Sequence, residues 1–359
     1  MNDFLVIGGG IAGVSAGARL SHLGQVLLLE QEEGLGYHAS GRSAALYEQT
    51  YGLPSTLVLN RASFDYHMHE NGGVLSPRGL MLLGTRDTAE SFASDLAKME
   101  LHRITLEEAR GVVPILRPDK VTEVGFRTEA WDIDTDRLIQ NFAREIRANG
   151  GTVATRAHVA DIRRTATGWE VDTRDTTHAA RILVNAAGAW VDHIAHLAGI
   201  RPLRFQPLRR SMARLPAPGG HDVSGWPMMF GTGETWYAKP DAGKLLVSPA
   251  EEDPVEPHDA WADDMVLAEG LARYEAMVTE PVTRVETSWA GLRTFAPDRC
   301  LVIGFDPRDD AFFWVAGQGG YGFQTSPAAS RLAADLVAGR APEIDAATVA
   351  QLSPARFDD

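Results

Sequence analysis

The first thirty residues alternate between apolar runs and a glycine-rich turn. Residues 3–7 form a short apolar run typical of a buried strand, and residues 25–30 form a second run that ends in an acid. Between them, apolar residues recur at helical spacing through residues 14–23. The glycine-rich turn, residues 8–13, separates the first strand from this helix. This order of elements predicts a βαβ unit in a parallel sheet.

The rest of the chain carries further helix and strand patterns. Helical periodicity recurs in residues 88–100, 136–149 and 326–339. Strand patterns occupy residues 152–157, 161–164, 169–173, 181–185, 301–304 and 312–316. A turn around residues 240–243 predicts a hairpin between residues 234–239 and 244–248.

These patterns predict two domains built from separated segments. Parallel-sheet signals lie at both ends of the chain, whereas antiparallel signals dominate its middle. We therefore predict an α/β, Rossmann-like nucleotide-binding domain from residues 1–46, 131–205 and 290–359. An antiparallel β-rich substrate domain, residues 47–130 and 206–289, is inserted into it. A chain of 359 residues is long enough for two such domains.

The glycine turn has the spacing of a dinucleotide-binding fingerprint. Gly8 permits the tight turn, Gly10 lets the backbone approach a pyrophosphate, and Gly13 lets helix and strand pack closely. The helix N-terminus offers free N–H groups to the anion. Glu30, 22 positions after Gly8, can accept hydrogen bonds from an adenosine ribose and disfavours the 2′-phosphate of NADP. A glycine-rich turn without a ligand is the less favoured alternative, because the flanking elements and the acid are all present.

Composition narrows the function classes. The net charge of −14 argues against nucleic acids and anionic membrane surfaces as partners. No apolar run reaches the ~20 residues that span a bilayer, so we expect no membrane span and a cytoplasmic protein. The single cysteine, Cys300, excludes an intramolecular disulfide and a cysteine metal cage. The only histidine cluster, His67-Met68-His69, lacks i, i+4 spacing; we interpret it as a solvated helix surface and predict no metal site.

Four further segments carry a resemblance to a known family. They are Gly41-Arg42-Ser43-Ala44-Ala45, Val184-Asn185-Ala186-Ala187-Gly188-Ala189-Trp190, Trp289-Ala290-Gly291-Leu292-Arg293 followed by Pro297-Asp298 and Val302-Ile303-Gly304, and the glycine cluster 317–322 before a helix. With the N-terminal unit, they resemble the FAD-dependent D-amino-acid oxidase superfamily, which includes glycine oxidase and sarcosine oxidase. The chain looks most like the bacterial D-arginine dehydrogenase group of D-amino-acid dehydrogenases.

The resemblance implies a glutathione-reductase-like FAD-binding domain and non-covalent FAD, with Cys300 an ordinary thiol. Segment 41–45 would run beside the pyrophosphate and the flavin, where Arg42 and Ser43 would supply donors. Backbone N–H groups from Gly322 to Thr325 would stabilise negative charge on the reduced flavin. The implied cofactor-binding residues are Gly8, Gly10, Ile11, Ala12, Gly13, Glu30, Gln31, Gly41, Arg42, Ser43, Ala44, Ala45, Val159, Ala187, Gly188, Trp190, Gly319, Gly320, Tyr321, Gly322, Gln324 and Thr325.

The same resemblance implies a site that holds an amino acid. Arginine binds a carboxylate in a bidentate way, and Arg210 and Arg293 match the family positions that do so. Tyr237 would hydrogen-bond the carboxylate, Tyr51 would lie near the amine, and the carbonyl of Gly320 would accept a hydrogen bond from the amine. Spacing alone also allows surface salt bridges for the arginines and core packing for the tyrosines.

Two neighbouring features refine this site. Strand alternation puts Arg209 and Arg210 on opposite faces, so that only one can face the flavin, and the resemblance selects Arg210. Gly52-Leu53-Pro54, next to Tyr51, has the turn chemistry of a mobile lid.

The side-chain pocket departs from the arginine-specific pattern. Leu80 stands where the arginine-oxidising relatives have a glutamate, and Leu46 where they have a histidine. Burying a cation without its partner is costly, so we expect D-arginine to be a poor substrate. Apolar side chains should do better against Leu46, Leu80 and Met228, with Gln324 also in the pocket. Glu48 would rescue a cation if its side chain pointed inward.

The expected reaction is FAD-dependent oxidation of a D-amino acid to the imino acid by hydride transfer from the α-carbon to flavin N5. Water then converts the imino acid to a 2-oxo acid and ammonia. Oxidation of an N-methyl amino acid, glycine or a 2-hydroxy acid is the alternative on this fold. An NAD-dependent dehydrogenase and a non-catalytic flavin-binding protein are more remote alternatives. The identity of the electron acceptor, whether oxygen, a quinone or another carrier, stays open.

Overall fold

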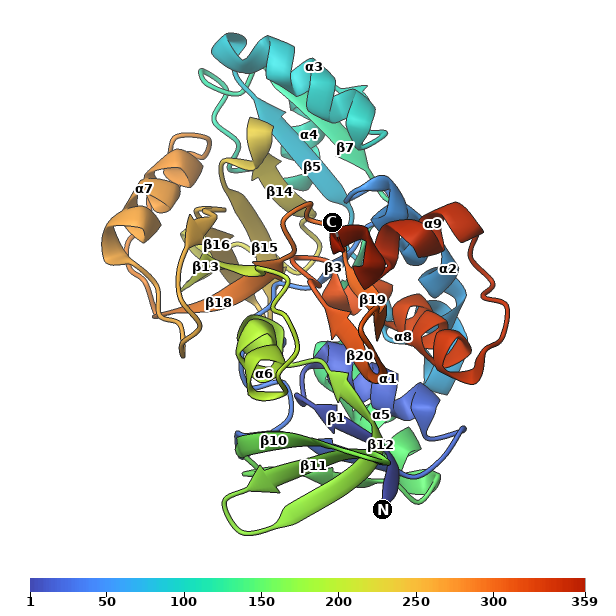
Figure 1. The fold of residues 1–359 in the computed structure, drawn as a ribbon. Helices are drawn as coiled ribbons and strands as arrows, with labels where there is room; N and C mark the ends of the chain where they lie inside the picture. The colour runs from blue at the N-terminus through green and yellow to red at the C-terminus, as the bar shows by residue number, and fades with distance from the viewer. Residues whose placement is uncertain (359) are drawn as a thin grey trace.

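A computed structural model describes residues 1–358, which form two main sheets with a small third sheet beside them (Figure 1). The first sheet has the order β10-β11-β12-β1-β2-β9, and β20 pairs with β12 and with β19. Its strands are β1 (Asn2–Ile7), β2 (Val26–Leu29), β9 (Thr152–Ala154), β10 (Val159–Thr165), β11 (Gly168–Thr173), β12 (Thr177–Asn185), β19 (Val302–Asp306) and β20 (Asp309–Ala316). The central strands are parallel, and their buried parts are mainly apolar because helices cover both faces.

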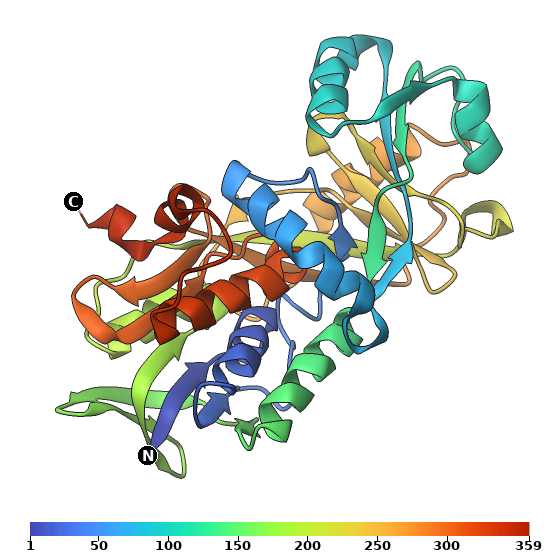
Figure 2. The same cartoon turned by 90° about the vertical axis from the view of Figure 1, so that its right-hand side faces the viewer.

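A layer of helices covers one face of this sheet, as Figure 2 shows. Helix α1 (Ile11–Leu20) packs against α5 (Thr135–Ala148) and α8 (Gly322–Ala338), and α8 packs against α2 (Pro54–His69). The short helix α6 (Val191–Leu197) packs against the other face of the sheet. Helix α9 (Ala346–Leu352) contacts α2 and β19.

The second sheet has the order β17-β13-β16-β15-β14-β5-β7-β6, and β18 also pairs with β13. Its strands are β5 (Leu80–Gly84), β6 (His102–Ile104), β7 (Glu123–Arg127), β13 (Gln206–Leu215), β14 (Met228–Gly231), β15 (Tyr237–Asp241), β16 (Lys244–Ser248), β17 (Asp253–Pro254) and β18 (Thr287–Phe295). The sheet is antiparallel except where β14 meets β5. These two strands come from the two separate segments of the predicted inserted domain.

Helices α4 (Leu106–Val112) and α7 (Asp264–Glu275) close the outer face of the second sheet. Helix α3 (Ala89–Lys98) packs over the end of β5 and β7. The third sheet consists of β3 (Leu46–Tyr47), β8 (Trp131–Ile133) and β4 (Leu75–Pro77). Its strands come from the segments in which the chain passes from one main sheet to the other. The mixed α/β fold and the largely antiparallel second sheet agree with the prediction.

Two boundaries of the proposed division into domains fall inside strands. The boundary between residues 46 and 47 divides β3, and residues 47–75, which include α2, pack in the core of the first sheet. A boundary at residue 290 falls inside β18, whose residues up to Phe295 pair with β13 of the second sheet. The chain returns to the first sheet only at β19. We therefore place the change of domain after Phe295.

Several element bounds differ from the predicted ones. Helix α1 begins at Ile11 and α8 at Gly322, each directly after its glycine turn. The hairpin turn consists of Ala242 and Gly243, both with positive φ, and Asp241 pairs with Lys244 across it. This is the two-residue turn that suits the twist of paired strands.

Helix α2 has no counterpart among the predicted helices. Its buried residues include Ser55, Asn60, Ser63 and His67, so that a polar face is packed inward. An apolar periodicity therefore does not reveal it. The interpretation of the histidine cluster as a solvated surface is wrong for His67, which is fully buried against α8, although His69 is exposed.

Candidate functional site

One cavity of about 860 Å³ runs between the two main sheets. Its volume suits a large organic ligand. Every predicted catalytic and side-chain pocket residue lines it, namely Tyr51, Arg210, Tyr237, Arg293, Gly320, Leu46, Glu48, Leu80, Met228 and Gln324. The predicted cofactor-binding residues that line it are Gly8, Gly10, Ile11, Ala12, Glu30, Gln31, Arg42, Ser43, Ala44, Ala45, Val159, Ala187, Gly188, Trp190, Gly319, Gly320, Gly322 and Gln324.

The glycine turn at one end of the cavity is too crowded for side chains. Gly8 has φ +111°, and a Cβ there would lie 2.4 Å from the carbonyl oxygen of Ala186. A Cβ on Gly13 would lie 1.9 Å from the carbonyl oxygen of Gly8. The first helix and strand thus approach as closely as the fingerprint requires. Gly13 contributes only through this close packing, because it does not itself line the cavity.

Two side chains organise the start of α1. The Glu30 carboxylate is buried and accepts hydrogen bonds from the N–H groups of Gly9, at 2.6 Å, and Glu32, at 2.8 Å. The hydroxyl of Ser40 accepts a hydrogen bond from the Ile11 N–H at 3.0 Å. Sequence reasoning missed Ser40, which lies outside the motif and approaches α1 only through the fold. Both contacts hold the turn with the N-terminus of α1 facing the cavity.

A second glycine-rich turn leads into α8 at the opposite wall. Gly319 has φ +51°, and a Cβ there would lie 2.2 Å from the Phe295 ring. The N–H groups of Gly322, Phe323 and Gln324 occupy the first turn of α8, where no carbonyl four residues earlier belongs to the helix. The Thr325 N–H instead donates to Tyr321 within the helix at 3.1 Å.

The arginines lie on the cavity-facing side of the second sheet. Arg210 is opposite Gly291 and Leu208 is opposite Arg293, so that both guanidinium-bearing residues share one face. The register through β16 to β15 puts Tyr237 on the same face. Arg293 also lies against the second glycine turn, because a Cβ on Gly320 would be 3.0 Å from its Nη1.

The two arginines differ in their partners. Arg210 is 8% exposed; its Nε donates to the carbonyl oxygen of Glu251 at 2.9 Å and its Nη2 lies 3.4 Å from Glu252. Burial and the charge of Arg293 lower the pKa of Arg210. Within residues 1–358, Arg293 forms no salt bridge with a carboxylate. Burial opposes its charge, but the neighbouring Tyr51, Tyr237 and Glu234 outweigh burial and raise the pKa of Arg293, which lines the cavity. Two guanidinium groups side by side create a site for an anion.

A family model described as FAD dependent oxidoreductase (DAO) matches residues 3–336. The chain belongs to this family. It is 23% identical to FAD-dependent oxidoreductase domain-containing protein 1 of Xenopus laevis, over 93% of this chain and 79% of that protein. It is 24% identical to glycine oxidase of Geobacillus kaustophilus, over 93% of this chain and 92% of that protein. The crystal structure of L-proline dehydrogenase from P. horikoshii matches with a TM-score of 0.83 and 20% identity, covering 99% of this chain and 97% of that one.

FAD is therefore the cofactor, and the cavity fits it. The crowded turn at Gly8 and Gly13, the N-terminus of α1 and the buried carboxylate of Glu30 would hold the ADP half at one end. The turn at Gly319 and the first residues of α8 form the opposite end. Cys300 does not line the cavity; its Sγ lies 3.7 Å from the Ser55 hydroxyl.

Four residues that the resemblance implied as cofactor contacts lie outside the lining of the cavity. Gly13, Gly41, Tyr321 and Thr325 do not line the cavity. Gly41 forms a turn in which a Cβ would lie 2.5 Å from the carbonyl of Gly36. Tyr321 caps α8, and the Thr325 N–H is used inside the helix, so the free N–H groups end at Gln324.

Arg42 lines the cavity, but its guanidinium has protein partners. Nη1 donates to the carbonyls of Ala260, at 2.9 Å, and Ala290, at 3.0 Å, and Nη2 forms an ion pair with Asp259. These contacts favour a positioning role for Arg42 over the donor role that the resemblance implied. The hydroxyl of Ser43 likewise accepts the Ala45 N–H at 3.1 Å.

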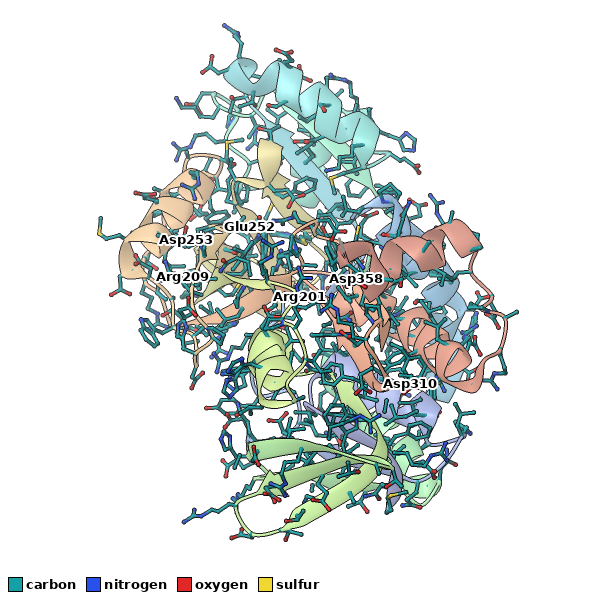
Figure 3. All side chains as sticks on the ribbon, in the orientation of Figure 1. Arg201, Arg209, Glu252, Asp253, Asp310 and Asp358 are labelled. Atoms are coloured by element: carbon teal, nitrogen blue, oxygen red, sulfur yellow. The ribbon has the colours of Figure 1, made fainter. Side chains whose placement is uncertain are left out.

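Arg209 confirms that the strand alternates at this point. It pairs with Asp253 at 2.8 Å and Asp263 at 3.7 Å, and none of these three residues lines the cavity. Figure 3 labels Arg209 and Asp253, which lie close together below α7. Arg210, the next residue, faces the cavity.

Tyr51 has an acidic partner that sequence reasoning missed. Its hydroxyl donates to Glu234 Oε2 at 3.2 Å, and its ring lies 5.3 Å from that of Tyr321. Burial raises the pKa of Tyr51, so that the phenol stays protonated. Glu234 lies in a 3₁₀ turn with φ +53° and lines the cavity. No motif marks it, because only the path of the chain between β14 and β15 brings it to Tyr51.

None of the helices in residues 1–358 is long and apolar enough to cross a membrane.

Proposed function

We propose that this flavoenzyme oxidises the α-carbon of a D-amino acid whose side chain is apolar or uncharged. The product is an imino acid, which water hydrolyses to a 2-oxo acid and ammonia. The observation that carries the proposal is the pair Arg210 and Arg293 on one face of the sheet, with Arg293 outside any salt bridge among residues 1–358 and in contact with Gly320. The likeness to glycine oxidase supports an amino acid as the substrate class.

The arginines and Tyr237 would hold the substrate carboxylate. Arg293 offers a guanidinium that forms no salt bridge among residues 1–358, and Arg210 offers Nη1, which has no hydrogen-bond partner there. Tyr237 is buried on the same face, with its ring in the wall of the cavity. A bidentate contact with a planar carboxylate fixes both the position and the rotation of the substrate.

Tyr51 and Gly320 would position the amine. Gly320 lies beside Arg293, so that an amino acid held through its carboxylate would bring its amine near Gly320, whose carbonyl would accept a hydrogen bond. Tyr51 donates its own proton to Glu234, which leaves the phenolic oxygen as an acceptor for an amine N–H.

FAD supplies the hydride acceptor when it is bound. The chain contributes the free N–H groups of Gly322, Phe323 and Gln324 at the start of α8, which favour negative charge nearby. The Gln324 amide adds a donor. Its Oε1 accepts the Glu48 N–H at 3.2 Å, and its buried Nε2 has no partner among residues 1–358.

The wall of the side-chain pocket carries no net negative charge. Leu46, Leu80 and Met228 line the cavity and would form this wall. Glu48 also lines it, but its carboxylate forms a buried ion pair with Arg127. The positive charge of Arg127 cancels that of Glu48, so that the rescue of a cationic side chain by Glu48 is not favoured. D-Arginine would have to bury its guanidinium without an unpaired anion, at a cost of several kcal/mol.

Glycine or an N-substituted glycine is the second candidate, and the likeness to glycine oxidase favours it. The arginine pair would hold these substrates equally well. They would leave the apolar wall formed by Leu46, Leu80 and Met228 without a contact, and this loss of buried apolar area favours the D-amino acid.

Anaerobic bleaching of the flavin tests the proposal. The purified holoenzyme is mixed without oxygen with D- and L-leucine, D-arginine, glycine, sarcosine and a 2-hydroxy acid. D-Leucine should bleach the flavin and yield the matching 2-oxo acid, and D-arginine should do so far more slowly. Bleaching by sarcosine or glycine but not by D-leucine would reject the D-amino acid and support the second candidate.

A further inference from the structure

Glu234 is an acidic residue in the wall of the cavity. It lines the cavity together with Tyr51, Arg210 and Arg293, and it is partly exposed. Its Oε2 accepts the hydrogen bond from the Tyr51 hydroxyl at 3.2 Å, and its Oε1 has no hydrogen-bond partner among residues 1–358. Oε1 is not one of the enclosed polar atoms that lack a partner, so the protein leaves it accessible. The carboxylate therefore has one oxygen held by Tyr51 and one that can be reached.

The turn that carries Glu234 does not by itself require a glutamate. Glu234 has φ +53°, a conformation that asparagine or aspartate adopts more readily. Other contacts fix the turn: the Gly233 N–H donates to Asp95 Oδ2 on α3 at 2.7 Å, and the Thr235 hydroxyl donates to the Thr232 carbonyl at 3.2 Å. The carboxylate of Glu234 is therefore not needed to hold the turn, which leaves it for a role toward the cavity.

Glu234 lies near the arginines without forming a salt bridge. Burial disfavours the charge of Arg293, and the nearby tyrosines and Glu234 favour it and raise its pKa. Arg210 has a different acidic neighbour, Glu252, 3.4 Å from its Nη2. Among residues 1–358, neither arginine pairs with Glu234, so the cavity presents two cationic groups beside one anionic group that they do not contact. A free amino acid at neutral pH carries the complementary pair, a carboxylate and an ammonium on one α-carbon.

We propose that Glu234 is a specificity-determining residue that supplies the negative charge for the ammonium group of the substrate. The arginines bind the carboxylate, and the ammonium donates to the phenolic oxygen of Tyr51, whose own proton goes to Glu234 Oε2. The site thus takes an amino acid as the zwitterion. A 2-hydroxy acid or a simple carboxylate is disfavoured, because it leaves the charge of Glu234 without a partner. This inference rests on the proposed oxidation of an amino acid and narrows the chemistry that the site accepts.

Two ligands of nearly equal shape test the inference in the holoenzyme. Isocaproate has the carboxylate and the side chain of leucine but no amine. The apparent Kd of D-leucine is taken from anaerobic flavin reduction in stopped flow, and the Ki of isocaproate from its inhibition of that reduction. D-2-Hydroxyisocaproate, with a hydroxyl in place of the amine, should reduce the wild-type flavin far more slowly than D-leucine.

Glu234→Gln removes the charge, while its carboxamide oxygen can still accept the hydrogen bond from Tyr51. The Kd of D-leucine should rise about tenfold, between the small effect of an exposed ion pair and the large effect of a buried one. The Ki of isocaproate should stay unchanged or fall, because the variant no longer repels its carboxylate. A general disturbance of the site would weaken both ligands.

Asp95→Asn is the matched control. It removes an acid that holds the same turn but does not line the cavity, and its carboxamide oxygen can still accept from Gly233. The constants for both ligands should stay within about twofold of the wild type. Glu234→Asn serves where Glu234→Gln is unstable, because asparagine suits the positive φ at this position.

The outcomes separate this inference from the proposed function. Equal weakening of D-leucine and isocaproate in Glu234→Gln overturns the inference, because the variant has then disturbed the carboxylate site. An unchanged Kd of D-leucine overturns it as well. Both results leave the proposed function standing, since D-leucine still reduces the flavin. Failure of every D-amino acid to reduce the wild-type flavin rejects the proposed function, and the inference falls with it.

Discussion

Arg209 and Arg210 provide an internally controlled test of the carboxylate site. They are adjacent on β13, but Arg209 pairs with Asp253 away from the cavity and Arg210 faces it. Replacing Arg210 by Met removes the buried guanidinium that would donate hydrogen bonds to the substrate carboxylate. Losing one partner of a buried, hydrogen-bonded charge pair costs about 2–4 kcal/mol. At about 1.4 kcal/mol per factor of ten, Arg210→Met should lower kcat/KM by about 30- to 1,000-fold.

Arg209→Met removes the same side chain from the opposite face. The side chain of its partner Asp253 is 46% exposed, and such surface pairs contribute about 0–1 kcal/mol to stability. We expect kcat/KM to stay within about twofold of the wild type, because nothing in the cavity changes.

The assay measures flavin reduction by D-leucine in stopped flow, with the FAD content of each variant determined first. Arg210→Lys should recover only part of the rate, since an ammonium group lacks the planar fork that matches a carboxylate. Equal losses in Arg209→Met and Arg210→Met, or unchanged substrate affinity in Arg210→Met with full FAD content, would refute the assignment of Arg210 to the carboxylate.

Three further predictions address the cofactor, the buried histidine and the amine site. Gly13→Ala should lose FAD, because its Cβ would lie 1.9 Å from a main-chain oxygen. Gly34→Ala is the control and should keep FAD, because no atom lies within 4 Å of the added Cβ. The ratio of flavin absorbance to protein absorbance measures the FAD content of both variants. Burial lowers the pKa of His67 from 6.5 to about 4, so the unfolded chain takes up the proton first as the pH falls. The free energy of unfolding should therefore fall by up to about 3 kcal/mol between pH ~6.5 and ~4, and urea titrations of His67→Gln should lack this slope. Tyr51→Phe and Glu234→Ala should each lower kcat/KM by about tenfold, and the double variant should lose little more, because each change removes the same hydrogen bond. A fully additive loss would contradict the coupling.

Local patterns in the sequence were enough to predict the framework of the fold. The strand, glycine turn, helix and acid at the N-terminus are all decided by short-range chemistry, and Glu30 meets the turn where the spacing placed it. The hairpin follows from the turn residues Pro240, Asp241 and Gly243, although Ala242 also adopts a positive φ, which residues other than glycine rarely do. Helix α2 was not predicted, because its buried residues Asn60, Ser63 and His67 are polar. Their hydrogen-bond partners lie on other segments and cannot be inferred from periodicity.

The candidate site was predicted as a set of residues but not as a set of contacts. The resemblance named residues such as Arg293 and Leu80, and the fold brings them into one cavity. The partners of those residues depend on register and on loop paths. Arg127 reaches Glu48 only because β7 pairs with β5 in the register that puts it opposite Leu80. Glu234 reaches Tyr51 across 183 positions of the sequence, and no local signal reports such a contact.

The measurement that tests the central claim most directly is single-turnover, anaerobic flavin reduction by D-leucine and by D-leucine deuterated at the α-carbon. We predict complete bleaching by both, with the deuterated substrate reacting more slowly because the α-hydrogen is removed as the flavin is reduced, and with the 2-oxo acid as the product. A flavin that D-leucine leaves fully oxidised, while glycine or sarcosine bleaches it, would contradict the account.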